Sequence, residues 1–458
     1  MSVTGELVAN VVRTRFDSID KESIERAKWR LIDALGCLMA GANAPGCRET
    51  AELIRKWGGA AESTVFVHGF KAPAHNAALA NSLMIRSFDF EPVEAEGENE
   101  TTSSPAHISG TTVSTALTMA ERQAASGKEL ITALIIGDDL ASRLGVASGF
   151  DFSFGWDNTG TINAFGATAI AGKLLKLSEK QVLNAFGIVV NQLGGSMALV
   201  WDKVMAFKLP IALAARNGIF SAELAAEGFT GVKDPFLGNH GYFSLYCPDY
   251  NTESLNRDLG KRFYADRVIK PYSACRATHS SIDSALKVVS DNDIRTENIA
   301  KIMVHLTPGV AKGFTGQPFI LGETPQIDGA FSIRYAVATA LLRKGVKPAY
   351  FTDACIRDPR IQGLVDKMEL AATIPPGKSP ATRIEVRMDD GTVHSAETAF
   401  PRGDIYRTPL TREEIRTKYR ENVAYGGAVS TQNAEKVLVM IESLEDIDDV
   451  RQITGLLL

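Results

Sequence analysis

Apolar side chains recur every three or four residues along most of the first half of the chain, a spacing that predicts helices. In the segment SIDKESIERAKWRLIDALGCLMAG, Ile24 and Leu31 belong to such an apolar series. Ser18 or Asp20 is the expected N-cap of this helix, because a side-chain oxygen there accepts from a free backbone N–H. Gly41 is the expected end of the helix, since glycine commonly terminates helices.

Two later segments are also predicted to be helices. TGTINAFGATAIAGKLLKL is rich in alanine and glycine and nearly free of charge until its end, and LPIALAARNGIFSAELAAEGFTG follows a similar pattern. A helix that is apolar on every side is typical of a buried helix, and small side chains allow neighbouring helices to approach closely. We therefore expect the first of these segments in the interior of a large helical domain.

The pattern changes after about residue 265, where apolar and polar residues alternate in NIAKIMVHLTP and in ATRIEVRMDDGTVHSAETAF. Asp390 and Gly391 form a strong hairpin-turn signal within the second of these runs. Helical spacing returns from about Thr411. The chain is therefore expected to be mainly α, with a large all-helical domain (1–264 and 406–458) and a smaller inserted α+β domain (265–405).

Composition and charge exclude several classes of protein. The 49 basic and 54 acidic residues give a net charge of -5, and without a basic tract we expect no nucleic-acid partner. No run of about 18 apolar residues predicts a membrane span. We expect no signal peptide, because the start of the chain lacks an apolar core segment. Five scattered cysteines fit a reducing, cytoplasmic setting better than a disulfide framework.

Motifs for phosphate, dinucleotide and metal binding are absent or incomplete. GATAIAGK has the wrong glycine spacing for a phosphate-binding loop, and no GxGxxG follows a predicted strand. Cys275 and His279 lie four residues apart, but a zinc site needs further ligands and no second close pair exists. The glutamates of the run Glu91–Glu100 offer ligands for a hard cation, although a solvated acidic loop is the expected reading.

Acid-base chemistry is the remaining class, and two histidines are candidates for it. His107 precedes a predicted helix, where the helix dipole favours the neutral form that acts as a base; a capping or surface histidine is the alternative. His279 opens another helix, and Lys270 and Arg276 beside it either grip carboxylates or form a surface basic cluster. Asp89 lies in an apolar stretch, where it is either an acid-base carboxyl or a helix-end cap.

Five segments together carry a resemblance to a known family. They are NSLMIRSFDFEP, HISGTTVSTALTMAE, WDNTGTINAFGATAIAGKLLKLS, LAARNGIFSAELAAEGFTG and KPYSACRATHSSIDSAL. In this order, over most of the chain, they resemble the MmgE/PrpD family, which includes 2-methylcitrate dehydratase, cis-aconitate decarboxylase and iminodisuccinate epimerase. The resemblance implies a homodimer, an active site between the two domains, and chemistry on small carboxylates without cofactor or metal.

The resemblance also implies roles for individual residues. Asp89 matches the first aspartate of the family's DFDD motif, His107 the histidine of HPSG, and His279 the histidine of CxxxH. These three are the expected catalytic residues, together with a lysine. Lys208 is the best match to the family's lysine, although the alignment is one place off and Lys203 is an alternative.

The expected substrate-binding residues come from two of the family's motifs. Lys270, Tyr272 and Arg276 match the flanks of CxxxH, and Thr159 lies in the run that matches HxTGT. Asp157 stands where the family usually has the histidine of HxTGT, so a potentially cationic group has become an anion. Since like charges repel at short range, we expect a substrate with fewer carboxylates than methylcitrate, or one with an amine or an extra hydroxyl.

The expected function is that of a cofactor-independent lyase of the dehydratase type. A histidine would take the proton next to a carboxylate, while basic side chains stabilise the negative charge that develops. Epimerisation and decarboxylation start from the same kind of proton transfer and remain alternatives. A binding protein that has kept the fold and lost its activity is the alternative of another class.

Overall fold

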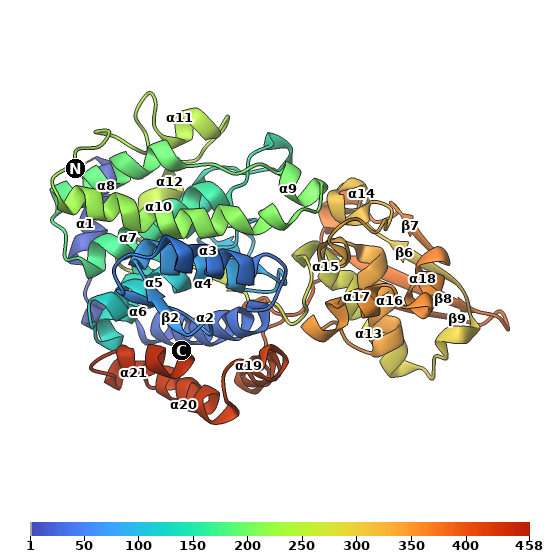
Figure 1. Ribbon diagram of the computed structural model, residues 1–458. Coiled ribbons are helices and arrows are strands. Elements are labelled where there is room, and N and C mark those ends of the chain that lie inside the picture. Colours follow the sequence, from blue (N-terminus) through green and yellow to red (C-terminus); the bar gives the residue numbers. More distant parts are fainter. Residues whose placement is uncertain (1) are drawn as a thin grey trace.

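The computed structural model describes residues 2–458 and divides into two parts of unequal size (Figure 1). The larger part contains both ends of the chain, and the smaller part, drawn in yellow and orange, lies to one side of it. The larger part is built mainly of helices, whereas the smaller one has helices packed around a sheet. This arrangement confirms the predicted fold class, a mainly α chain with a small α+β part.

The helices of the larger part come from two separated stretches of chain. The first stretch contributes α1 (Val3–Arg13), α2 (Lys21–Gly41), α3 (Cys47–Trp57), α4 (Ala74–Arg86), α5 (Ser109–Arg122), α6 (Gly127–Ala147), α7 (Thr159–Leu174), α8 (Glu179–Val189), α9 (Ala198–Trp201), α10 (Leu209–Ala226), α11 (Tyr242–Tyr246) and α12 (Glu253–Asn256). The second contributes α19 (Arg412–Gly426), α20 (Thr431–Glu442) and α21 (Arg451–Thr454). None of the helices within residues 2–458 combines the length and the apolar character that a membrane crossing requires.

The structure confirms the helix signals predicted from the sequence. Asp20 caps α2 by accepting from the backbone N–H of Ser23, and Gly41 is the last residue of that helix. The alanine- and glycine-rich α7 is buried along almost its whole length and packs against α6 and α10. A side chain on Gly218 of α10 would place its Cβ 2.5 Å from the Cβ of Ala167 in α7, so this close helix contact requires glycine.

The smaller part contains a four-stranded sheet of order β7-β6-β8-β9. Its strands are β6 (Ile299–His305), β7 (Met368–Ala371), β8 (Thr382–Met388) and β9 (Val393–Thr398), and its helices are α13 (His279–Asp291), α14 (Pro308–Lys312), α15 (Pro325–Ala330), α16 (Ile333–Arg343), α17 (Asp353–Ile356) and α18 (Pro359–Asp366). The predicted turn joins β8 to β9 as an antiparallel hairpin, and Gly391 has a φ of 90°, which favours glycine.

Five short strands belong to the larger part. They are β1 (Ser63–Val65), β2 (Phe70–Ala72), β3 (Val93–Glu96), β4 (Ser103–Ser104) and β5 (Asp266–Val268). The chain leaves the larger part after β5, which pairs with β3, and returns beside it, because Val268 also bridges to Asp404. The division at 264/265 and 405/406 remains a proposal; β5 and Asp404 lie within the proposed small domain and contact the large one.

The two parts contact each other through aromatic side chains. The ring of Phe314, from the smaller part, lies 6.0 Å from that of Trp201 and 6.1 Å from that of Phe152 in the larger part. Phe331 of the smaller part similarly lies 5.2 Å from Phe207. These edge-on contacts hold the two parts together near the predicted site residues.

Candidate functional site

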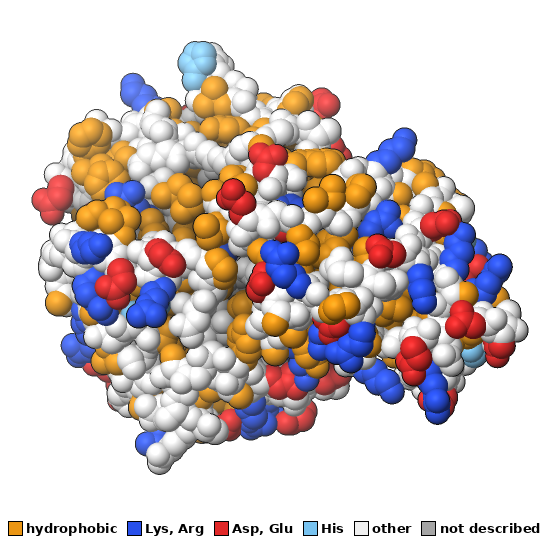
Figure 2. All heavy atoms as spheres, turned by 45° about the vertical axis from the view of Figure 1, so that its right-hand side comes forward, with side chains coloured by type: hydrophobic (Ala, Val, Ile, Leu, Met, Phe, Trp, Pro, Cys, Tyr) orange, Lys and Arg blue, Asp and Glu red, His pale blue; other side chains and the backbone are white. Residues whose placement is uncertain are grey.

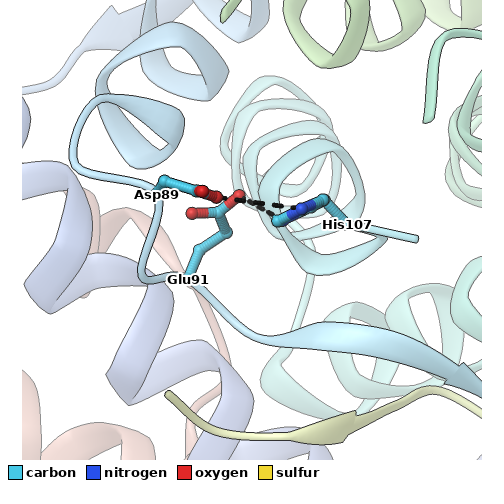
Figure 3. Close-up of side chains that lie close together, drawn as sticks. All are labelled: Asp89, Glu91 and His107. Atoms are coloured by element: carbon cyan, nitrogen blue, oxygen red, sulfur yellow. Dashed lines mark ion pairs between the residues drawn. The ribbon is translucent and has the colours of Figure 1, made fainter. Parts of the chain in front are cut away.

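Asp89, Glu91 and His107 converge in the larger part, next to the point where the chain crosses to the smaller one (Figure 3). Nδ1 of His107 lies 2.8 Å from Oε1 of Glu91, and Nε2 lies 3.8 Å from Oδ1 of Asp89. Both carboxylates are fully buried, whereas the His107 side chain keeps 18% of its surface exposed. The imidazole is therefore the group of this cluster that a solute can reach.

The local backbone explains why these side chains meet. Asp89 and Glu91 follow directly after α4 in a tight turn, in which Asp89 has a φ of 50°, a left-handed conformation that is unusual for a residue other than glycine. His107 lies just before α5. The turn after α4 and the start of α5 face each other, so the two carboxylates reach the imidazole from one side (Figure 3).

Two buried cations neutralise the two carboxylates. Nη1 of Arg86 pairs with Oδ1 of Asp89 and lies 2.9 Å from Oε1 of Glu91. Nζ of Lys270, from the segment after β5, lies 3.0 Å from Oδ1 of Asp89 and also donates to its backbone carbonyl. Burial alone would keep these carboxyl groups protonated, but paired charges stabilise one another in a dry interior. The cluster is thus an ion network and not a set of isolated acids.

This network moves the pKa values of its members. Burial acts to raise the pKa of Asp89, but Arg86 and Lys270 together hold it below its usual value. Glu91 behaves likewise: burial opposes ionisation, and the charges of Arg86 and His107 keep its pKa well below the usual range. Burial, followed by the charge of Arg86, lowers the pKa of His107. At neutral pH the imidazole is therefore neutral and lies beside two carboxylates.

Two groups contact Nδ1 of His107: Oε1 of Glu91 at 2.8 Å, which can only accept, and Nη1 of Arg86 at 3.1 Å, which can only donate. We assign the proton to Nδ1 from the shorter contact, the one with Glu91. Nε2 then keeps its lone pair and can take up a proton. A carboxylate that orients a histidine in this way is a recurrent feature of proton-transfer sites.

The backbone around His107 is fixed by two residues from other elements. Asp266, in β5, accepts from the backbone N–H groups of Ile108 (3.3 Å) and Ser109 (2.7 Å), and so caps α5, which has no side-chain cap of its own. Asn163, in α7, donates to the carbonyl of His107 at 2.7 Å. Burial raises the pKa of Asp266 to about 7.

The CxxxH segment brings only part of its predicted residues to the cluster. Lys270 belongs to it directly, so the alternative of a surface basic cluster does not apply to this lysine. The guanidinium of Arg276 pairs with Glu94 at 3.3 Å, at the edge of the same region. The hydroxyl of Tyr272 donates to Asp283 at 2.5 Å, and burial raises the pKa of this tyrosine.

His279 occupies a different environment from His107. Its side chain is fully buried at the start of α13, and Nε2 lies 3.0 Å from the carbonyl oxygen of Ala274. Its ring packs edge-on against Tyr272 at 5.2 Å. Burial, together with the charges of Arg276 and Lys270, places the pKa of His279 well below its usual value. This histidine is neutral and held within the smaller part, and it does not belong to the Asp89 cluster.

The two candidate lysines differ in burial. Lys208 is buried and donates from Nζ to the carbonyl of Pro45 at 2.7 Å, and its pKa is lowered by burial. The ring of Phe207 lies 5.9 Å from this ammonium and 5.2 Å from the guanidinium of Arg86. Lys203 is less buried, and its pKa is also lowered by burial. Of the two lysines, Lys208 therefore shares a neighbour, Phe207, with Arg86 of the cluster.

Asp157 and Thr159 lie together at the start of α7. Oδ1 of Asp157 accepts from the backbone N–H of Thr159 at 2.9 Å and from its hydroxyl at 2.6 Å. The aspartate thus closes an Asx turn onto the first residue of α7, whose N-cap residue, Asn158, makes no side-chain cap. Burial acts to lower the pKa of Arg86, but nearby negative charges raise it above its usual value. Asp157 is one of these charges, and its contribution follows those of Asp89 and Glu91. Asp157 is partly exposed beside the cluster, in agreement with a place at the edge of a binding site.

The ligand atoms of Asp89, Glu91 and His107 lie within 4.8 Å of one another, a spacing that a metal ion could use. However, Arg86 and Lys270 already lie against the oxygens that would bind the ion. A divalent cation would have to approach two fixed positive charges at short range. The donor set of this cluster therefore fits proton transfer better than metal binding, and the expectation of a site without metal stands as a proposal.

Two glutamates of the predicted acidic loop form buried ion pairs that the sequence did not indicate. The expectation of a solvated acidic loop is wrong for Glu91 and Glu96, which are fully buried. Glu91 contacts Arg86 and His107, and Glu96 pairs with Arg26 at 2.5 Å. The signal that could have found Glu91 is its spacing, since it lies two residues after Asp89 and follows the same helix end.

Comparisons with known proteins agree with the family named from the motifs. The MmgE/PrpD N-terminal domain matches residues 5–254, and the MmgE/PrpD C-terminal domain matches residues 272–446. A "Cis-aconitate decarboxylase-like protein oryM" of Aspergillus oryzae is 26% identical over 483 residues, which cover 100% of this chain and 97% of the relative. Two proteins named "Cis-aconitate decarboxylase" are also similar. The one from Aspergillus terreus is 24% identical (99% of this chain, 96% of the relative), and the one from Mus musculus is 25% identical (100% and 93%).

Proposed function

This chain belongs to the MmgE/PrpD family, and we propose that it is a lyase that acts on a small carboxylic acid by proton transfer at a carbon next to a carboxylate. The observation that carries this proposal is the 2.8 Å contact between Nδ1 of His107 and Glu91, from which we assign the proton to Nδ1 and the lone pair to Nε2. A neutral, oriented imidazole with a pKa below its usual value is suited to act as a general base at neutral pH.

The surrounding charges support the second half of the reaction. Removal of the proton next to a carboxylate places negative charge on that carboxylate, and fixed cations stabilise such charge when they are already in place. Arg86 and Lys270 are two such cations, buried behind the imidazole and already paired with Asp89 and Glu91. Arg276, which pairs with Glu94, is the cation proposed to bind the substrate carboxylate itself. Lys208 completes the set of proposed catalytic residues, and Tyr272 and Thr159 complete the proposed substrate-binding residues.

Dehydration follows from this arrangement most directly, because a base removes the proton and a hydroxyl leaves from the neighbouring carbon. The leaving hydroxyl also takes up a proton, and the imidazolium of His107 formed in the first step supplies it, because Asp89 is ionised and His279 is neutral. Decarboxylation is the second candidate, and the names of the relatives favour it, since three of them are called cis-aconitate decarboxylases or decarboxylase-like. In that case the bond to carbon dioxide breaks, and the carbon left behind takes up a proton from the protonated form of His107. Epimerisation needs only removal and return of the proton.

The charge of Asp157 bears on the choice of substrate. Its carboxylate lies where a basic group is expected in the family, and one of its oxygens accepts from Thr159 in the turn that opens α7. An additional anion at the edge of the site disfavours a third substrate carboxylate at short range. The proposed substrate is therefore a hydroxy or unsaturated acid with fewer carboxylates than methylcitrate, or one that offers Asp157 an amine or a hydroxyl.

A homodimer, expected from the family resemblance, is supported by an apolar surface on the larger part. Figure 2 shows many apolar side chains on the surface of the larger part. Along α10, Leu209, Leu213 and Phe220 are each between 38% and 43% exposed and recur at helical spacing. Monomeric proteins rarely expose contiguous apolar patches of this kind, so we assign this stripe of α10 to the contact between two copies of the chain. The action without cofactor and the cytoplasmic location are proposed with it.

The experiment that tests the function combines a ligand screen with isotope exchange. The purified protein is first screened by thermal shift against cis-aconitate, citrate, malate and related small acids, because a ligand at about 100 times its Kd stabilises the folded state by roughly 2.7 kcal/mol. Acids that bind are then incubated in deuterated water and followed by mass spectrometry. Loss of water supports a dehydratase, loss of carbon dioxide a decarboxylase, and deuterium uptake without loss an epimerase.

A His107→Gln variant serves as the control for these incubations. Binding without any turnover or exchange in the wild-type protein would favour the inactive binding protein over the lyase. Turnover of methylcitrate as efficient as that of smaller acids would contradict the role assigned to Asp157. Turnover that persists undiminished in His107→Gln would remove the basis of the proposed mechanism.

A further inference from the structure

The turn that carries Asp89 is held by side chains from three distant segments. The backbone carbonyl of Ser87 accepts from Nε2 of Gln326 at 2.8 Å, and that of Phe90 accepts from Nζ of Lys418 at 2.8 Å. The carbonyl between them, that of Asp89, accepts from Nζ of Lys270. Three of four consecutive carbonyls in residues 87–90 thus receive a donor from outside the turn.

The turn needs such support for two physical reasons. The left-handed backbone of Asp89 costs energy for a residue with a Cβ, and a conformation of this kind persists only where its surroundings fix it. In addition, the carbonyl of Ser87, the C-cap residue of α4, has no partner within the helix and lies at the negative end of its dipole. Gln326 satisfies this carbonyl, and the two lysines satisfy the carbonyls of Asp89 and Phe90 beyond the helix end.

Lys418 reaches the turn from the C-terminal stretch of the larger part. It lies on the buried face of α19, and 9% of the residue is exposed. Its ammonium lies 2.7 Å from Oδ1 of Asp33 in α2 and 4.5 Å from the centre of the Phe90 ring. The pair with Asp33 compensates the charge of the lysine, so the hydrogen bond to the Phe90 carbonyl is made by a fixed donor.

Gln326 reaches the same turn from the smaller part. It lies in α15, is 6% exposed, and makes a polar contact across the boundary between the two parts. A buried amide that loses its partner costs free energy, so this hydrogen bond favours the arrangement in which α15 lies against the end of α4. The position of the turn is therefore linked to the position of the smaller part.

We infer that Lys418 and Gln326 are positioning residues for the proposed proton transfer. They act through the backbone of Phe90 and Ser87, and so hold the carboxylates of Asp89 and Glu91 in place around His107. This inference rests on the proposed function for its kinetic consequences, whereas its structural consequence concerns the environment of His107 alone. The active cluster then forms fully only when the C-terminal helix and the smaller part are both docked on the turn.

The first test removes the donor from α19. Lys418→Met is combined with Asp33→Asn, so that the buried pair is removed together and no unpaired charge is left behind. Arg420→Met is the matched control on the same helix, since Arg420 makes an exposed ion pair with Glu435. We expect kcat to fall by up to about 10²-fold in the double variant, because displacement of catalytic groups by about 1 Å can cost this much, with little change in KM. The control keeps the wild-type kcat.

The second test removes the donor from the smaller part. Gln326→Leu is compared with Gln362→Leu, whose side chain donates to the carbonyl of Ile356 within the smaller part itself. The assay uses whichever acid the wild-type protein turns over, with cis-aconitate as the first probe. A fall in kcat is expected for Gln326→Leu alone. Equal kcat in the two glutamine variants, both folded by circular dichroism, would overturn the role of Gln326.

A readout without substrate separates this inference from the proposed function. The seven histidines are labelled with carbon-13 and titrated by NMR, with exposed His240 as the internal reference. The signal of His107 is expected to shift and to titrate with a different midpoint in Lys418→Met/Asp33→Asn and in Gln326→Leu, and to remain unchanged in the two controls. An unchanged His107 signal in both test variants refutes the inference. Absence of turnover in the wild-type protein refutes the proposed function. The NMR result alone then decides whether Lys418 and Gln326 are positioning residues.

Discussion

Nδ1 of His107 lies 2.8 Å from Oε1 of Glu91, and this contact links a histidine of the HISG motif to a glutamate from the turn after α4. The carboxylate can only accept, so we assign the proton to Nδ1 and the lone pair to Nε2, although the donor Arg86 also lies 3.1 Å from Nδ1. The same oxygen of Glu91 lies 2.9 Å from Arg86, which keeps the carboxylate ionised in spite of its burial. The proposed chemistry depends on this arrangement, and the following predictions test its parts.

Replacement of His107 by Gln is expected to lower kcat by about 10²–10⁴-fold, the usual contribution of an acid-base group. The side chain is partly exposed, so the melting temperature should change little. Steady-state kinetics on the acid identified by the screen, together with thermal unfolding, measure the two effects. A large fall in melting temperature with normal kcat for the folded protein would assign His107 a structural role.

Replacement of Glu91 by Gln is expected to change the pH profile of kcat/KM. The glutamate charge raises the pKa of His107, against burial and Arg86, which lower it. Without that charge the pKa of His107 falls further, so the acid limb of the profile moves to lower pH. The plateau is expected to fall by about 10²-fold, at the lower end of the range for acid-base groups, since the amide no longer enforces one tautomer. An acid limb that moves to higher pH would contradict this assignment.

Replacement of His279 by Ala is expected to destabilise the protein. The imidazole is fully buried, contacts the carbonyl of Ala274 and packs against Tyr272, so its removal leaves a cavity and costs about 2 kcal/mol or more. Chemical denaturation measures this loss, with His107→Ala as the matched control at a more exposed histidine. Stability equal to that of the wild type would show that the packing of His279 contributes little.

Replacement of Asp266 by Asn is expected to change how stability depends on pH. Burial raises the pKa of Asp266 from 3.8 to about 7, so the folded protein binds this proton more tightly than the unfolded chain does. The stability gained in this way is complete below the unfolded pKa and is lost as the pH rises towards 7. The wild-type protein should therefore lose stability relative to Asp266→Asn between about pH 4 and pH 7 in urea titrations. A difference that is constant with pH would contradict the raised pKa.

Replacement of Leu213 and Phe220 by Glu is expected to convert a dimer into a monomer. Two charges in the apolar stripe of α10 would have to be buried without partners in the proposed contact. Light scattering after gel filtration measures the mass, with the 49.4 kDa chain as the unit. Val439→Glu, at an exposed apolar position of α20, is the control and should not change the mass. A wild-type protein that is already monomeric would contradict the proposed contact.

The sequence determined the parts of this protein that depend on local chemistry. Asp20 predicted the start of α2, Gly391 the hairpin between β8 and β9, and the alanine- and glycine-rich run the buried α7, because caps, turns and small residues act within a few positions of themselves. The order of the motifs predicted the family, and with it the two-part fold. It also singled out Asp89 and His107, which the structure brings together.

Tertiary structure decided what local signals leave open. Glu91 reads as one of several acidic residues in a loop, and only its burial against Arg86 shows that it orients His107. Lys418 and Gln326 carry no motif, since each acts on a carbonyl far away in the sequence. An ion pair or hydrogen bond between distant segments depends on packing that no short stretch of sequence contains. The chain thus specifies which residues can do chemistry, and the fold selects which of them meet.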